Sequence, residues 1–212
     1  MSKCDITSLA ISDFNPKGLL ANKHVQSILA SSKVRKRLLK KQACGLLAHE
    51  KTTLLECGDG VRLHALHSPQ PHKKSQSSGS GNHNKLVILI HGWEGSAEST
   101  YLLSTASALF NQGYSILRLH LRDHGPSAHL NEALFHAARL DEVAGAIQEV
   151  KATLPYDSYS LVGFSLGGNI ALRISQRAEK YKLHLDSVTA ISPVISPSET
   201  MDALNNGSAL YR

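Results

Sequence analysis

Cysteine is scarce in this sequence, and its placement excludes two common uses of the residue. The chain holds three cysteines, Cys4, Cys44 and Cys57. They are odd in number, widely spaced and never arranged as Cys-x-x-Cys. Disulfide scaffolds and thiolate metal sites need paired or closely spaced thiols. We therefore expect neither in this protein.

Long apolar runs are also missing. The longest, Leu86–Ile90, is far shorter than the roughly 20 residues that a transmembrane helix requires. The N-terminus carries Asp5 and Asp13 around a brief apolar stretch and lacks the charged-then-apolar layout of a signal peptide. These absences predict a cytoplasmic protein without a transmembrane segment.

Metal-ligand patterns are absent although the chain has 12 histidines. There is no His-Glu-x-x-His, and the strand-like, odd spacing of His64 and His67 directs them to opposite faces. A metal site needs several ligands that converge on one point. We therefore predict no metal site.

The net charge of +6 comes partly from one basic cluster, formed by Lys33, Arg35, Lys36, Arg37, Lys40 and Lys41. Such a cluster can contact nucleic acid or an anionic membrane surface. It can also be the solvated face of a helix, because Val34 and Leu38 continue an apolar stripe. That stripe begins with Val25, Ile28 and Leu29. We favour the solvated face, expect no nucleic-acid partner and leave peripheral membrane contact open.

The N-terminal third predicts helices and then a hairpin. A helical segment at about 15–45 has its clearest periodicity from Leu19 to Lys41, and Gly45 is expected to end it. Strands at 52–56 and 61–67 are joined by Gly58-Asp59-Gly60, a hairpin signal. The Ser-, Gly- and Pro-rich stretch at about 68–85 predicts a flexible surface loop within one domain.

From residue 86 onward, predicted strands and helices alternate. The strands lie at 86–90, 115–121, 159–162 and 187–191, and the helices at 98–110, 140–154 and 166–180. Near-continuous apolar runs are typical of strands that are covered on both faces. The alternation predicts an α/β fold: a mostly parallel sheet with helices on both faces, preceded by an antiparallel hairpin.

The stretch Gly163-Phe164-Ser165-Leu166-Gly167-Gly168 lies between a predicted strand and a predicted helix. In that setting Gly-x-Ser-x-Gly indicates a sharp turn that exposes a nucleophilic serine in a strained backbone conformation. Gly163 and Gly167 flank the turn, where side chains would collide. We predict Ser165 as the nucleophile; a glycine-rich turn with an incidental serine is the alternative.

Another loop follows the strand at 86–90, and it reads His91-Gly92-Trp93-Glu94-Gly95. Loops in this position supply a backbone donor to a developing oxyanion, together with the N–H of the residue after the serine. We predict the amides of Trp93 and Leu166 as the two donors, with His91 and Gly92 as supporting residues of the motif. For the loop 122–127 we favour a structural role.

The order of these loops resembles the α/β-hydrolase superfamily. Phe14-Asn15-Pro16 and Asn22–Ile28, together with Leu134–Glu142, resemble its YheT-like branch. The resemblance implies hydrolysis of carboxylic or acyl-lipid esters through an acyl-serine at Ser165, without a cofactor, on a small-molecule substrate. Acyl transfer would use the same acyl-serine, so both reactions stay open.

The chain departs from that family after Ser165. The family order places an acid and then a histidine on later loops, but His184 is the only histidine after Ser165. His184 and Asp186 precede the strand at 187–191 and so are expected at the opposite edge of the sheet from Ser165. Asp202 is placed better, but no histidine follows it. His91 and His124 are the alternative bases on the correct edge.

We therefore expect residues 1–212 to form a single α/β-hydrolase domain that lacks the C-terminal part of the fold. Its last strand, at 187–191, would then be an uncovered edge. The activity of the chain is predicted to be impaired. The alternative is a non-catalytic, truncated hydrolase domain with a binding role or no independent role.

Overall fold

The sheet has six strands in the order β1-β2-β4-β3-β5-β6. The computed structural model describes residues 15–71 and 84–206. The strands are β1 Lys51–Glu56, β2 Arg62–Ser68, β3 Lys85–Ile90, β4 Ser115–Leu119, β5 Ser158–Phe164 and β6 Ser187–Ile191. The α-helices are α1 Lys23–Ser31, α2 Lys33–Gln42, α3 Cys44–Ala48, α4 Thr100–Asn111, α5 Leu140–Thr153, α6 Leu166–Gln176 and α7 Pro197–Asn205, with 3-10 turns η2 Gly18–Ala21 and η4 Gly125–Ser127.

The predicted hairpin opens the sheet. Strands β1 and β2 pair antiparallel from Lys51↔His67 to Glu56↔Arg62. Gly58, Asp59 and Gly60 all have positive φ, the conformation that glycine and aspartate tolerate best in tight turns. β2 then pairs antiparallel with β4, and every later pairing is parallel. The predicted fold class is therefore confirmed.

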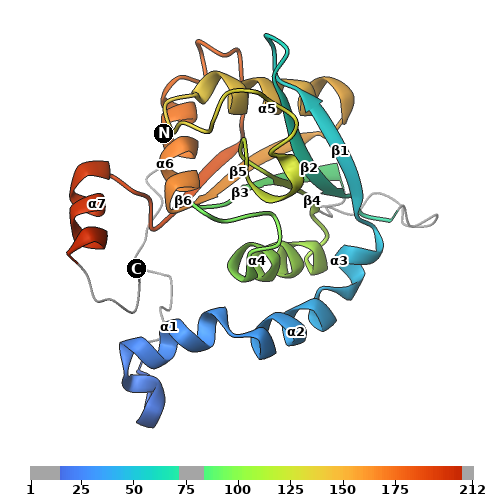
Figure 1. Cartoon of the computed structure of the whole chain (residues 1–212). Helices are drawn as coiled ribbons and strands as arrows, with labels where there is room; N and C mark the ends of the chain where they lie inside the picture. Colours follow the sequence, from blue (N-terminus) through green and yellow to red (C-terminus); the bar gives the residue numbers. More distant parts are fainter. Residues whose placement is uncertain (1–14, 72–83, 207–212) are drawn as a thin grey trace, which may run out of the picture.

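The position of β3 in the sheet explains why its residues from Leu86 to Ile90 are all apolar. Leu86, Ile88 and Ile90 enter a core under α5 and α6, whereas Val87 and Leu89 enter a second core under α3 and α4. Successive side chains of a strand point to opposite faces, so a strand buried on both faces has no polar position. Figure 1 shows α5 and α6 on one face of the sheet and α4 on the other.

Strand β6 is an edge strand, as predicted. It pairs only with β5 in the described sheet. Its side chains alternate between exposed and half-buried, and Ile191 is 38% exposed. An apolar residue on an unpaired strand is an aggregation hazard.

Two predictions for the N-terminal helices are wrong. Ser32 has extended backbone (ψ 146°) and divides the expected helix into α1 and α2, because its hydroxyl caps α2 by accepting from the Arg35 N–H. Gly45 does not end a helix but lies inside α3, where a Cβ would contact the ring of Phe110 at 3.9 Å. That is an ordinary van der Waals distance, so the packing against α4 leaves room for a side-chain carbon at Gly45.

The apolar stripe proposed for the basic cluster is not the buried side of α2. Its members Val34 and Leu38 are 68% and 57% exposed, and the buried residue is Leu39. Ala43 and Leu46 continue that contact into the core beside α4. Helical periodicity alone does not predict whether the side of α2 with Val34 and Leu38 or the side with Leu39 is buried.

Most of the loop predicted at 68–85 lies outside the described residues. Within the part that the structure describes, no helix is long and apolar enough to cross a membrane.

Candidate active site

Ser165 stands at the turn between β5 and α6, with φ 50° and ψ −115°. A non-glycine residue in this region of φ/ψ space costs about 1–3 kcal/mol and persists only where its surroundings enforce it. Here the Ser165 N–H donates to the Ile191 carbonyl (3.0 Å), and its carbonyl accepts from Val194 N (3.3 Å). The strained turn predicted from the sequence is present.

Two glycines allow three segments to meet at this turn. A Cβ at Gly163 would lie 2.1 Å from the Gly167 carbonyl oxygen, and a Cβ at Gly167 would lie 2.4 Å from the His91 carbonyl oxygen. No side chain fits either position. The end of β3, the end of β5 and the start of α6 are therefore in backbone contact beside Ser165.

The loop after β3 lies against the serine. A Cβ at Gly92 would be 3.1 Å from Ser165 Cβ and 3.7 Å from its Oγ. The Gly95 N–H donates to the Gly92 carbonyl (3.1 Å), which closes a tight turn around the exposed Trp93. Leu166 begins α6, so its N–H has no acceptor within the helix. Fold and turn thus bring both predicted donor segments to Ser165.

Tyr101 joins the two loops, and the sequence analysis missed it. Its hydroxyl accepts from the Gly92 N–H (3.0 Å), and its ring lies 5.0 Å from that of Phe164, the residue before Ser165. No local pattern marks a tyrosine in the first turn of a helix as part of a site. Its role depends on contacts that form only when β3, α4 and β5 are assembled.

Comparison with known proteins gives this arrangement a family. Residues 85–210, more than half of the chain, match the family of the alpha/beta hydrolase fold. The chain belongs to the α/β-hydrolase fold family. Among curated relatives, an esterase/lipase-like protein of Haemophilus influenzae is 31% identical over 90 residues (42% of this chain, 29% of that protein). A serine hydrolase-like protein of Danio rerio is 25% identical over 126 residues (59% and 36%).

Solved structures agree on the fold. An esterase of Pyrococcus furiosus superposes with a TM-score of 0.59 at 19% identity, over 76% of this chain and 58% of that one. An esterase of Pyrobaculum calidifontis gives a TM-score of 0.56 at 18% identity, over 92% and 65%. The chain thus spans about a third of the length of the curated relatives and about three-fifths of these structures.

In this hydrolase fold, His91 is a buried scaffold residue. Its Nε2 accepts from the Leu121 N–H (3.1 Å), so its Nδ1 carries the proton and donates to the Gly92 carbonyl (2.7 Å). Burial lowers the pKa of His91 to about 4. Both nitrogens are occupied in holding the loop beside Ser165, which leaves neither to accept a proton from a substrate or nucleophile.

Within the part of the chain that the structure describes, His124 forms a hydrogen bond through only one of its ring nitrogens. Its Nδ1 lies 2.7 Å from the Arg122 carbonyl, and since a carbonyl can only accept, Nδ1 carries the proton. In the neutral ring the Nε2 lone pair is then available to accept a proton. The ring is held between His91 and Phe135, with centroids 4.9 and 5.0 Å away.

The rest of the loop 122–127 makes scaffold contacts, which agrees with the structural role favoured for it. The buried guanidinium of Arg122 donates to the Glu142 carboxylate (Nη2 to Oε1, 2.7 Å) and to the Ala133 carbonyl (2.9 Å). Asp123 accepts from the Phe135 N–H (2.6 Å). The loop therefore ties the segment before α5 to the sheet.

His184 and Asp186 lie far from Ser165, as predicted. Asp186 accepts from the Ser158 hydroxyl (3.0 Å) and the Tyr159 N–H (2.8 Å), at the start of β5. Ser165 follows the other end of that strand, and a strand of this length spans roughly 20 Å. Asp202 is an exposed residue of α7.

Two more buried or half-buried histidines of the described residues have side-chain partners from distant segments. His64 meets His120 (Nδ1 to Nδ1, 3.0 Å), whereas His67 on the other face of β2 meets the Tyr156 hydroxyl (2.9 Å). Across residues 15–71 and 84–206, no group of three or more His, Cys, Asp or Glu side chains is arranged to hold a metal ion.

Proposed function

We propose that this protein is a serine hydrolase that cleaves carboxylic esters of small acyl or lipid substrates, with Ser165 as the nucleophile. The observation that carries the proposal is the strained backbone of Ser165 at a strand-to-helix turn with Gly92 beside its hydroxyl. The hydroxyl attacks the ester carbonyl, the alcohol leaves, and water then releases the acid from the acyl-serine. The two esterases of similar fold support this substrate class.

The backbone amides of Trp93 and Leu166 are proposed to stabilise the oxyanion of that attack. Trp93 follows Gly92, which lies against Ser165, and Leu166 is the first residue of α6, where a backbone N–H has no acceptor within the helix. One such donor contributes about 10²–10³ in rate. Gly92, whose own N–H is already taken by Tyr101, serves as a spacer.

The base is the weak part of the site. Among the hydrogen bonds of residues 15–71 and 84–206, none joins the Ser165 hydroxyl to a histidine, and a serine is a poor nucleophile until a positioned base takes its proton. His124 Nε2 is the proposed acceptor within this chain. We therefore expect slow turnover, which agrees with the impairment inferred from the sequence.

The resemblance of residues 14–16, 22–28 and 134–142 to the YheT-like branch is the ground for proposing that the protein belongs to that branch. The proposed location is the cytoplasm.

Labelling with a fluorophosphonate probe tests the proposal. Wild-type chain is expected to label slowly at one site, whereas Ser165→Ala is expected not to label, because the probe reacts only with an activated serine. A p-nitrophenyl ester should show the same difference in turnover. Ser160→Ala, in the same strand, is the matched control and should label like wild type. Equal labelling of Ser165→Ala and wild type would refute the assignment.

A folded wild-type sample without labelling would favour the second candidate, a non-catalytic hydrolase domain. The specific observation behind this candidate is the lack of a hydrogen-bonded histidine at Ser165. The role of His124 separates the two: His124→Gln is expected to reduce labelling by about 10²-fold or more if the ring acts as the base. An unchanged labelling rate would remove His124 from the mechanism.

Tyr101→Phe is predicted to slow labelling roughly tenfold while leaving the fold intact. The change removes the acceptor of the Gly92 N–H, and an unsatisfied buried donor costs about 1–3 kcal/mol. That cost loosens the turn that carries the Trp93 amide. Rates of probe labelling should be compared with those of Tyr114→Phe, which removes a hydroxyl elsewhere. Equal rates for both variants would show that the Tyr101 bond does not position the loop.

A further inference from the structure

Positive charge is segregated in the N-terminal part of the fold. We call residues 17–42, which contain η2, α1 and α2, the arm. Eight of the chain's 23 Lys and Arg residues lie in the arm, and no Asp or Glu occurs between Asp13 and Glu50. The rest of the chain contains the other 15 basic residues and all 17 acidic residues. The whole positive excess of the protein is therefore carried by this one segment.

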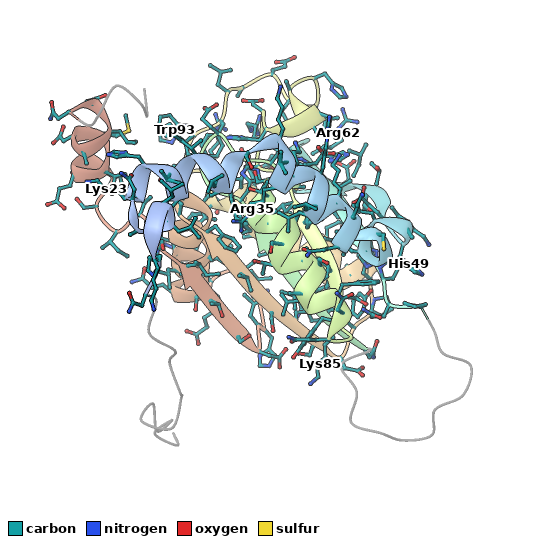
Figure 2. All side chains as sticks on the ribbon, turned by 90° about the horizontal axis from the view of Figure 1, so that it is seen from below. Lys23, Arg35, His49, Arg62, Lys85 and Trp93 are labelled. Carbon is teal, nitrogen blue, oxygen red and sulfur yellow. The ribbon has the colours of Figure 1, made fainter. Side chains whose placement is uncertain are left out.

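The charges of the arm are all presented to solvent. Its eight basic residues, Lys17, Lys23, Lys33, Arg35, Lys36, Arg37, Lys40 and Lys41, are all exposed. The ion pairs formed within the described residues involve Arg118, Arg122, Arg139 and Lys180 and include no Lys or Arg of the arm. Figure 2 shows α1 and α2 lying across one face of the molecule, with Lys23 and Arg35 along them.

Large apolar side chains are exposed on the same segment. Leu19 is 82% exposed, Val34 68%, Leu38 57% and Leu29 46%. Val34 and Leu38 are four residues apart and so form one ridge of α2. Leu39, on a different side of the helix, is buried, and α2 packs against α4. The ridge is thus held outward on an anchored helix, with Arg37 and Lys41 next to it.

Two hydrogen bonds join the arm to α4. The Ser107 hydroxyl of α4 donates to the Gln42 carbonyl (3.3 Å), and the Thr100 hydroxyl donates to the Ala30 carbonyl (3.4 Å). A cavity of about 440 Å³ separates the arm from the start of α4, lined by Ala30, Arg35, Lys36, Ser99 and Tyr101 among others. Tyr101, which lines this cavity together with Arg35 and Lys36, also accepts the hydrogen bond from Gly92 in the loop beside Ser165.

We propose that the arm docks the protein on the surface of an anionic lipid bilayer. Basic side chains beside exposed leucine and valine are the combination that binds helices at a lipid interface: the charges meet acidic headgroups and the apolar ridge enters the acyl boundary. A second copy of this chain is a poor occupant because it would bring two sets of eight positive charges together. Nucleic acid would use the charges but gain nothing from the ridge, and the arm has no Phe, Tyr or Trp for base stacking.

The inference goes beyond ester hydrolysis and is tested without it. Full-length protein is sedimented with vesicles of phosphatidylcholine containing about 30% phosphatidylserine, and with vesicles of phosphatidylcholine alone. Binding is expected to be at least about tenfold tighter to the acidic vesicles, since each basic residue near such a surface contributes roughly fivefold. It is expected to weaken at high salt. Ser165→Ala should bind like wild type, so loss of labelling leaves this result unaffected.

Three sets of variants separate the arm from net charge. Lys36→Glu with Lys40→Glu and Lys41→Glu is expected to weaken binding at least about 100-fold. The control, Lys51→Glu with Lys85→Glu and Lys182→Glu, makes the same change in net charge outside the arm and should weaken it less than about threefold. Val34→Ser with Leu38→Ser keeps all charges and should weaken it about tenfold. Because these side chains are exposed, circular dichroism should show an unchanged fold.

Several outcomes would overturn the proposal. Equal binding to acidic and neutral vesicles would do so, as would equal losses for the two lysine triples. Undiminished vesicle binding by the Val34/Leu38 variant, together with equally tight binding of double-stranded DNA by that variant and wild type, would identify the arm as a nucleic-acid surface instead.

Discussion

Gly163→Ala is expected to destabilise the folded chain by about 3 kcal/mol or more and to abolish labelling of Ser165. The added methyl group would stand 2.1 Å from the carbonyl oxygen of Gly167 and 2.7 Å from the Gly168 nitrogen. Both are backbone atoms of the first turn of α6, so no side-chain rotation relieves the clash. The turn that holds Ser165 at positive φ would have to open.

Urea unfolding followed by circular dichroism measures this effect, and Gly45→Ala is the matched control. Gly45 lies in α3, has room for a Cβ and gains helix propensity on substitution. It should be neutral or stabilising by up to about 1 kcal/mol. A Gly163→Ala chain that unfolds at the wild-type urea concentration would show that the backbone contact at the turn is not tight.

Acidification from pH 7.5 to pH 5 is expected to destabilise the fold by about 2 kcal/mol for each of three buried histidines. Burial lowers the pKa of His67 and His91 to about 4 and that of His120 to about 3. The ordinary pKa of histidine is 6.5. Between the lowered pKa values and pH 6.5, these histidines are therefore protonated in the unfolded chain but neutral in the folded chain. The stabilisation is complete above pH 6.5 and is lost as the pH falls toward 4.

The combined loss, on the order of 6 kcal/mol, is comparable to the whole stability of many domains. Unfolding free energies across this pH range should therefore fall steeply. His67→Phe should remove about a third of the slope, because its ring is buried against Tyr156. Exposed His184 provides the control, and His184→Gln should leave the slope unchanged. A pH-independent stability would contradict the neutral, buried state of these rings.

Local patterns in the sequence predicted the frame of the molecule. The hairpin, strand β6 at 187–191 and the apolar strand β3 lie where expected, since turn glycines and fully apolar runs leave few alternatives. The strained turn at Ser165 was predicted for the same reason, because Gly-x-Ser-x-Gly between a strand and a helix carries its geometry locally. The catalytic role of Ser165 remains a prediction.

Assembly decided the features that depend on contacts between distant residues. Gly45 was expected to end a helix, but it lies within α3, which packs against α4. Leu38 and Leu39 are neighbouring leucines of α2, and only the packing of α2 against α4 in the folded chain leaves Leu39 buried and Leu38 exposed. Tyr101 belongs to the site through its contacts with Gly92 and Phe164. These residues lie nine positions before and 63 positions after Tyr101 in the sequence. No periodic pattern in the sequence indicates such contacts.

The sequence by itself determined the α/β architecture and the turn at Ser165, because each depends on residue type and order along the chain. Tertiary structure distinguished the two candidate bases: among the described residues, His91 forms hydrogen bonds at both ring nitrogens and His124 at one. It also decided that the basic arm presents its apolar ridge to solvent. Hydrogen-bond partners and burial depend on contacts between segments that are distant in the sequence. They therefore cannot be predicted from the local sequence pattern.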